Sequence, residues 1–169
     1  TVHTGQDPGE HGVIINLFRG IDGLSPNSET LAEVLLAEGW NTGAFVSGFT
    51  LRRKLGLDQG FEIYSTPASK QKRRDGAKTA DVLFKWLKYK FGRHFVWYHT
   101  YDPHGPWHIY GEYSRAKKGE KHAQQIPLYQ RISGVTDPKI YEALYARSVE
   151  YADKQIDRII DWLKKRGRY

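Results

Sequence analysis

The chain has 169 residues, of which 39% are hydrophobic and 14% aromatic, a composition typical of a globular domain with a core of its own. It contains no cysteine, which excludes disulfides, thiolate nucleophiles and cysteine-based zinc or iron–sulfur sites. No apolar run reaches the length of about eighteen residues that a membrane-spanning helix needs, and no charged-then-apolar leader is visible. The sequence indicates no compartment.

The formal net charge of +7 favours an anionic partner or substrate. The basic residues gather in four clusters: Arg52–Lys54, Lys70–Arg74, Lys117–Lys118 and Lys164–Arg166. A nucleic-acid site would gather such charge on one face among stacking aromatic residues. These clusters instead fall in separate loops and at one helix end, so we interpret them as solvated surface and expect no nucleic-acid partner.

The first part of the chain is rich in turns up to residue 29, and its short apolar run Val13–Ile15 predicts a brief strand or a tether to the core. A helix is predicted from Thr30, because Thr30 and Glu33 have the spacing of a capping box. Gly39 is predicted to be its left-handed C-terminal cap. The predicted inward stripe consists of Leu31, Val34 and Leu35.

Further elements alternate along the chain. A strand is predicted over 40–47, a helix over 78–90, a strand over 95–98 and a long helix over 137–166. The predicted inward residues are Val82, Leu83, Trp86 and Leu87 on the first of these helices and Leu144, Ser148, Tyr151, Ile156, Ile159, Ile160 and Leu163 on the second. This alternation predicts an α/β fold with three layers (helix, sheet, helix) and a mostly parallel sheet, in one domain over 1–169.

Between these elements, residues 65–76 are predicted to be a polar surface connection. Residues 108–137 show little periodicity, and we expect a long loop excursion near the functional site.

The most informative stretch is the loop 99–107, which follows the predicted strand 95–98. Pro103, Gly105 and Pro106 exclude a regular element, so the loop carries two imidazoles and a carboxylate in a fixed conformation. Ligands of open α/β sheets bind beyond the carboxyl ends of the strands, where this loop would lie. The residues alone leave two interpretations open, a functional site or a turn shaped by the prolines with its histidines in solvent.

Six segments, in order, resemble motifs of the sulfatase family of the alkaline-phosphatase-like superfamily, over nearly the whole chain. They are Thr4-Gly5 with Pro8 and His11–Val13 (TG-x-x-P-x-x-HGV), Thr30–Leu35 with Gly39, Trp40 and Thr42 (TLAExLKxxGYxT), Ala44–Ser47 (AFVS), Gly56–Phe61 (GLxQGF), Asp102–Trp107 (DPHxPY/W) and Ser148–Asp153 with Gln155-Ile156 (the helix before the last catalytic strand). Each motif alone is weak, but their order makes the resemblance strong.

The resemblance implies hydrolysis of a sulfate ester by a formylglycine nucleophile with a divalent cation, calcium or magnesium. His104 matches the family histidine that contacts the sulfate or the leaving-group oxygen, where a protonated imidazole acts as a general acid. His99 and Asp102 are expected to orient the loop or to bind substrate directly. Ser47 stands opposite the lysine of the family's GKWH segment and is the remaining candidate for substrate binding. The implied substrate is a sulfate-ester or related anionic small molecule or glycan.

The chain also departs from the family pattern. The nucleophile motif C/S-x-P-x-R and the first metal-binding aspartates would precede Thr1, and the Asp-His-Gly metal segment would follow the last helix. The chain is therefore interpreted as an internal fragment with no metal ligands of its own, and it is expected to be inactive alone. A small sheet of about three strands would leave exposed edges, through which the fragment could self-associate.

Two alternatives stay open. A phosphodiesterase, phosphonate hydrolase or phosphoethanolamine transferase of the same superfamily would share these segments, since the missing nucleophile distinguishes them. A non-catalytic basic module that binds anions through residues 108–137 and the lysine clusters is the second alternative, and a steep salt dependence of binding would support it.

Overall fold

The computed structural model describes residues 2–14, 23–68, 70–105, 107 and 125–169. The chain divides into two compact units, Thr1–His99 and Thr100–Tyr169, called here the sheet unit and the helix unit. Each is described by itself. The prediction of a single domain over 1–169 stays a prediction.

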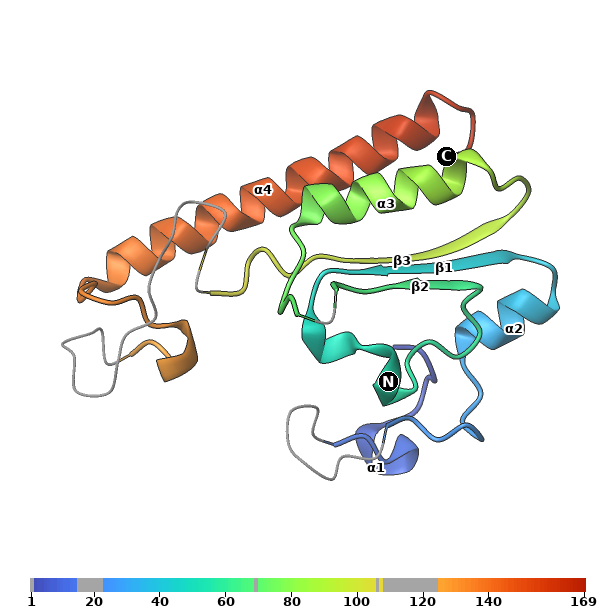
Figure 1. Cartoon of the computed structure of the whole chain (residues 1–169), viewed down its shortest axis with the longest axis horizontal. Coiled ribbons are helices and arrows are strands. Elements are labelled where there is room, and N and C mark those ends of the chain that lie inside the picture. The colour runs from blue at the N-terminus through green and yellow to red at the C-terminus, as the bar shows by residue number, and fades with distance from the viewer. Residues whose placement is uncertain (1, 15–22, 69, 106, 108–124) are drawn as a thin grey trace. The chain divides into compact units, whose positions relative to one another are not determined.

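The sheet unit is built on three parallel strands, β1 (Asn41–Val46), β2 (Ile63–Ser65) and β3 (His94–His99), in the order β2-β1-β3. β1 lies in the middle, and its residues from Thr42 to Val46 are all buried. Such continuous burial is typical of a parallel strand covered on both faces. The predicted α/β fold with a parallel sheet is therefore confirmed (Figure 1).

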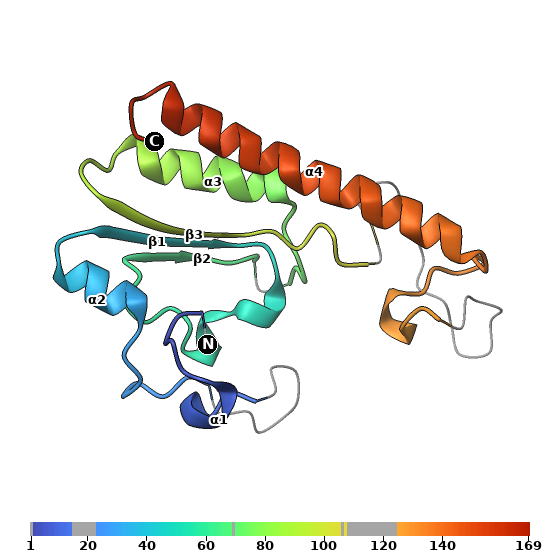
Figure 2. The ribbon, with the colours of Figure 1, turned by 180° about the vertical axis from the view of Figure 1, so that it is seen from behind.

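Two helices cover the sheet from opposite faces, α2 (Leu31–Ala37) from one and α3 (Gly76–Lys88) from the other (Figures 1 and 2). The side chain of Asp75 caps α3 by accepting a hydrogen bond from the Lys78 amide at 3.0 Å. Ala80, Leu83 and Leu87 form the buried side of α3. The predicted three-layer arrangement is confirmed in this unit, and α3 begins two residues before the predicted start.

The short elements of the sheet unit are the helix α1 (Pro8–His11) and the 3-10 helices η1 (Phe49–Leu51) and η2 (Arg53–Leu55). The expected strand at Val13–Ile15 does not form over Val13 and Ile14, and Ile14 is 74% exposed, while Ile15 lies outside the described residues.

The capping box of α2 forms as predicted, but the predicted inward face of this helix is wrong. Leu31 is 46% exposed and Val34 42% exposed, whereas Ala32 is completely buried in the core. The small side chain of Ala32 allows the helix to approach the loop around Gly60 closely, and an apolar stripe of larger residues would hold it farther away. This helix of seven residues thus packs on the sheet unit through Ala32, which lies in the core cluster, rather than through a long stripe of large side chains.

The core of the sheet unit is largely aromatic. Phe61 stacks on Phe95 with ring centroids 5.7 Å apart, and it also contacts Tyr64 and Trp97. These rings pack with Ala32, Ala44 and Val46 in one hydrophobic cluster. Large aromatic rings bury much apolar surface each, so this cluster contributes strongly to the stability of so small a sheet.

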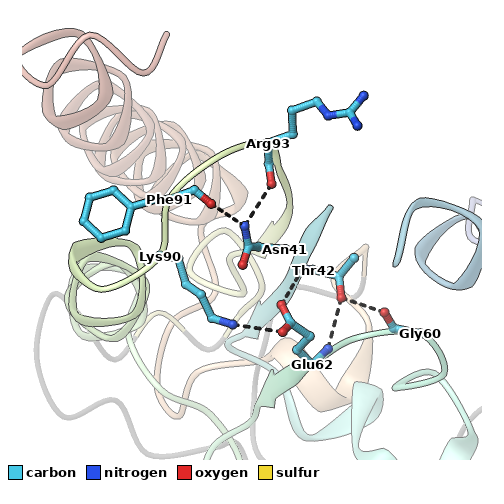
Figure 3. Close-up of polar contacts among 7 residues, drawn as sticks. All are labelled: Asn41, Thr42, Gly60, Glu62, Lys90, Phe91 and Arg93. Atoms are coloured by element: carbon cyan, nitrogen blue, oxygen red, sulfur yellow. Dashed lines mark hydrogen bonds and ion pairs between the residues drawn. The ribbon is translucent and has the colours of Figure 1, made fainter. Parts of the chain in front are cut away.

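Polar contacts fasten the amino-terminal edge of the sheet (Figure 3). The hydroxyl of Thr42 donates to the carbonyl of Gly60 at 2.7 Å and accepts from the amide of Glu62 at 3.0 Å. The Glu62 carboxylate in turn accepts from the Thr42 amide at 3.1 Å and pairs with Lys90 at 2.9 Å. These bonds fix the start of β1 against the residues that lead into β2.

The helix unit contains the 3-10 helix η4 (Leu128–Gln130) and the long helix α4 (Pro138–Lys164), which Asp137 caps by accepting from the Lys139 amide at 2.9 Å. The helix is confirmed, but part of its predicted inward stripe is wrong, since Ile156 is 43% exposed and Tyr151 only half-buried. The buried residues of α4 are Tyr141, Leu144, Ser148, Ala152 and Gln155. Their spacing of three and four residues follows one face of an α-helix. This buried face therefore includes the small or polar residues Ser148, Ala152 and Gln155 as well as the larger Tyr141 and Leu144.

Trp107, Ile132, Tyr141 and Leu144 form the hydrophobic cluster of the helix unit. Of the predicted excursion 108–137, residues 108–124 lie outside the described residues, and 125–137 are irregular apart from η4. No helix in the described part of the chain is long and apolar enough to cross a membrane.

Candidate functional site

The carboxyl ends of the three strands lie level at one edge of the sheet. In the parallel register, Phe45 is opposite Ser65 and Val46 is opposite His99. The amide of Ser47 donates to the carbonyl of His99 at 3.0 Å, so the pairing of β1 with β3 continues one residue past β1. The structure thus brings together Ser47 and His99, two predicted site residues, at the edge where α/β sheets bind ligands.

Ser47 is completely buried, and its hydroxyl lies 2.8 Å from the hydroxyl of Thr79 on α3. Because the Thr79 hydroxyl donates its one hydrogen to the Asp75 carbonyl, at 2.9 Å, the Ser47 hydroxyl is the donor of the pair. In the structure Ser47 therefore links β1 to the first turn of α3. Its role in substrate binding stays a prediction.

His99 ends β3 with its ring half-buried beside Trp97, at a centroid distance of 6.3 Å. Burial lowers the pKa of His99 below its ordinary value, because the charged imidazolium is poorly solvated there. The ring is consequently neutral at neutral pH, where it can accept or donate a hydrogen bond but does not contribute a positive charge.

Arg74 is a charged residue at this edge that the sequence analysis did not single out. Its guanidinium donates to the hydroxyls of Thr79 (3.1 Å) and Ser65 (3.0 Å) and to the carbonyls of Val46 (3.2 Å) and Ser65 (3.3 Å). Burial lowers its pKa, although an arginine stays charged at neutral pH. The sequence placed Arg74 in a polar surface connection, and only the folded chain shows that two strands end beside it.

The loop after β3 is held by its own side chains. Asp102 is only 4% exposed, and its carboxylate accepts a hydrogen bond from the Thr100 hydroxyl. The indole of Trp107 is buried and donates to the Pro103 carbonyl at 3.1 Å. The described residues of this loop, 100–105 and 107, form no helix or strand, as predicted, while Pro106 lies outside the described residues. Asp102 fastens the loop internally through its bond to Thr100. Its direct contact with substrate stays a prediction.

His104 is half-buried between two tyrosine rings of the helix unit. It stacks on Tyr101 at a centroid distance of 4.4 Å and lies 5.7 Å from Tyr129. Its Nδ1 lies 2.6 Å from the Gly105 carbonyl, an oxygen that can only accept, so the proton of this contact belongs to Nδ1. Proton exchange with a ligand would thus go through Nε2. Tyr129 was missed, because it falls in the excursion that has no readable pattern.

No three His, Asp or Glu side chains cluster as a cation site within the described ranges. The residues present do not fit the divalent cation that the family resemblance implies, so no chemical step is assigned to such an ion here. The predicted site residues Ser47 and His99 instead lie at the sheet edge with Arg74, and Asp102 and His104 lie in the loop.

The comparisons with known proteins agree with this fold. The sulfatase family model matches residues 1–169. Two solved structures are similar to this chain. The phosphonate monoester hydrolase of Agrobacterium radiobacter is 15% identical with a TM-score of 0.70, and the match covers 99% of this chain and 49% of that one. A protein of the alkaline phosphatase superfamily from Vibrio parahaemolyticus is 18% identical with a TM-score of 0.52, and the match covers 97% of this chain and 37% of that one. A search of curated proteins finds no match. The chain spans about half the length of the first structure and less of the second. Because the family model covers the whole of it, the chain belongs to the sulfatase family.

Proposed function

We propose that this chain is part of a sulfatase-family hydrolase that cleaves sulfate esters, and that His104 is the general acid of the reaction. The observation that carries the proposal is the clamped position of the His104 ring on the fixed loop after β3, in a chain that the family model matches throughout. A rigid imidazole with a defined Nδ1 bond presents one tautomer, which is what directed proton transfer requires.

In the proposed reaction, the bond between sulfur and the leaving-group oxygen breaks, and that oxygen takes up a proton. The protonated His104 supplies this proton from Nε2 while Nδ1 keeps its bond to the Gly105 carbonyl. Asp102 holds the loop in shape through Thr100, so the imidazole does not swing away as its charge changes. Nucleophilic attack is assigned to a group outside this chain, which is accordingly expected to be inactive alone.

Hydrolysis of a phosphonate monoester is the second candidate. One of the two similar structures, with a TM-score of 0.70, is named as a phosphonate monoester hydrolase. A phosphonate ester resembles a sulfate ester in its tetrahedral anionic centre. Protonation of the leaving oxygen by His104 would serve both reactions, so this geometry alone does not favour one of them.

The test begins with the open reading frame on both sides of this chain, followed by assays of its whole product on an aryl sulfate and an aryl phosphonate monoester. We expect turnover of the sulfate, which His104→Ala should slow strongly when the aryl leaving group is weakly activated and which His94→Gln, a matched change at the opposite end of β3, should leave unchanged. Preference for the phosphonate would move the assignment to the second candidate. A whole product that hydrolyses neither ester, or a frame that starts and stops with this chain, would overturn the proposal.

A further inference from the structure

Two segments that together carry four basic residues lie side by side at the carboxyl edge of the sheet. The segment 71–74, which leads into α3, runs antiparallel to 47–52, which follows β1. Three hydrogen bonds join them. The Arg74 amide donates to the Ser47 carbonyl (2.9 Å) and the Phe49 amide to the Lys72 carbonyl (2.9 Å), and these two bonds form an isolated antiparallel bridge of Gly48 with Arg73. The third runs from Arg52 Nη2 to the Gln71 carbonyl (3.3 Å). Neither segment contains an acidic residue.

This pairing concentrates positive charge. Arg52, Lys72, Arg73 and Arg74 fall within ten residues of chain that backbone hydrogen bonds hold together. Like charges brought close in this way repel one another, and an anion bound between them would relieve that repulsion. The backbone contacts thus bring these four basic residues together, an arrangement that suits a negatively charged ligand even though the acidic Asp75 directly follows Arg74.

Arg74 is the fixed centre of this edge. Four of its five N–H groups donate to neutral oxygens, namely those of Val46, Ser65 and Thr79. No carboxylate of the described residues lies within ion-pair distance of it, so its charge is positioned but not neutralised there. One hydrogen on Nη1 remains beyond these four bonds. A guanidinium already held in place loses little conformational freedom when it binds an oxyanion.

We propose that Arg74, with the neighbouring Lys72, binds a tetrahedral oxyanion group of the substrate, a sulfate or a phosphate, at the carboxyl ends of β1 and β2. That the group belongs to a substrate rests on the proposed function. The binding of the anion does not rest on the proposed function, because it involves no turnover. The anion site could therefore be confirmed although the whole protein hydrolyses no sulfate ester, and hydrolysis could be confirmed although Arg74 binds no anion.

The experiment titrates this chain with sodium sulfate, and in a second arm with sodium phosphate, at constant ionic strength made up with chloride. Amide chemical shifts report where the anion binds. We expect the shifts to concentrate at 46–48, 65 and 72–79 around the sheet edge. Tighter binding of sulfate than of phosphate, or the reverse, identifies the group that the site prefers.

Variants then test the residue. Arg74→Gln is expected to weaken binding by about tenfold or more, and Arg74→Lys, which keeps the charge but loses the planar fork, by less. The matched control is Arg93→Gln, which removes the same charge at the amino end of β3, where the guanidinium donates to the Glu38 carbonyl at 3.3 Å. Its affinity for sulfate should stay within about twofold of the wild type, since general attraction at that distance is largely screened.

Loss of the clamp on Val46 and Ser65 also removes structural bonds, so folding of each variant is checked by circular dichroism and thermal unfolding. If Arg74→Gln does not fold, the affinity of Arg74→Lys and the positions of the shifted amides in the wild type decide whether the anion binds at Arg74. Shifts confined to another basic cluster such as 164–166, or equal weakening by Arg93→Gln and Arg74→Gln, would overturn the site. So would a folded Arg74→Gln variant with unchanged affinity, which would leave Arg74 a purely structural clamp.

Discussion

The imidazole of His3 lies with its centroid 3.8 Å from that of the Trp97 indole, which joins the first residues of the chain to the middle of β3. Phe61 meets the same imidazole edge-on at 5.7 Å. The ring is buried, and its Nε2 has no hydrogen-bond partner among the described residues. A charged imidazolium in this aromatic setting would be poorly solvated, so burial lowers the pKa of His3 from 6.5 to about 4.

The first prediction concerns acid stability. Because the folded-state pKa of His3 lies below its unfolded value, the unfolded chain binds more protons between about pH 6.5 and 4. His3 therefore adds stability above pH 6.5 that is lost as the pH falls through this window, and burial of His99 acts in the same direction. Urea unfolding of wild type and His3→Phe, which keeps a ring but cannot titrate, should give a shallower pH dependence for the variant. Parallel curves would show that His3 does not charge on unfolding.

The second prediction concerns His104 in the whole protein. A general acid matters most when the leaving-group oxygen is strongly basic, so His104→Ala should slow hydrolysis of an alkyl or weakly activated aryl ester by about 10²- to 10⁴-fold. A nitrophenyl ester, whose oxygen leaves without protonation, should be slowed far less. The measurement is kcat against leaving-group pKa, whose slope should steepen in the variant. An equal loss for all esters would instead indicate that His104 binds the anion or shapes the loop.

Local pattern was enough to predict much of this fold. The capping box at Thr30 and Glu33, the buried run Ala44–Val46 and the irregular loop over the described residues 102–105 and 107 all depend on residues close in sequence, and each is found. Strand β2 was missed, because three residues flanked by polar sequence become a strand only by pairing with Gly43–Phe45, about twenty residues away. Its existence depends on tertiary contact rather than on propensity.

The candidate site was predictable to a similar extent. His99, Asp102 and His104 follow a strong strand pattern, so their place beyond a strand end could be read from the chain. Arg74 could not, because its four bonds depend on two strands ending level and on α3 starting beside them. The exposed faces of α2 and α4 were misjudged for a related reason. Hydrophobicity alone does not tell which of two apolar stripes meets a partner.

The third prediction compares a buried hydroxyl with an exposed ion pair at the amino-terminal edge (Figure 3). Thr42→Val keeps the shape of the side chain but leaves the Gly60 carbonyl and the Glu62 amide without the bonds that the hydroxyl makes. It should reduce the free energy of unfolding by about 2 kcal/mol. Lys90→Gln removes only the partner of Glu62, at the edge of solvent, and should cost less than about 1 kcal/mol. A larger loss for Lys90→Gln in urea unfolding would reverse the ranking.

The last prediction separates two costs of replacing a glycine. Gly60 has φ +78°, and a Cβ there would lie 2.1 Å from the Glu33 amide nitrogen and 2.5 Å from the Ala32 carbonyl carbon, both backbone atoms of α2. Gly39 has nearly the same φ, +76°, but a Cβ there would meet nothing within 4 Å. Gly39→Ala should therefore cost only the strain of the left-handed conformation, about 1–2 kcal/mol. Gly60→Ala adds a clash that no side-chain rotation relieves, because α2 itself must move, and should cost about 4 kcal/mol or more.

The difference in urea unfolding free energy between the two variants measures how tightly α2 is held against the loop before β2. Equal losses of unfolding free energy would show that α2 moves away from Gly60 at little cost.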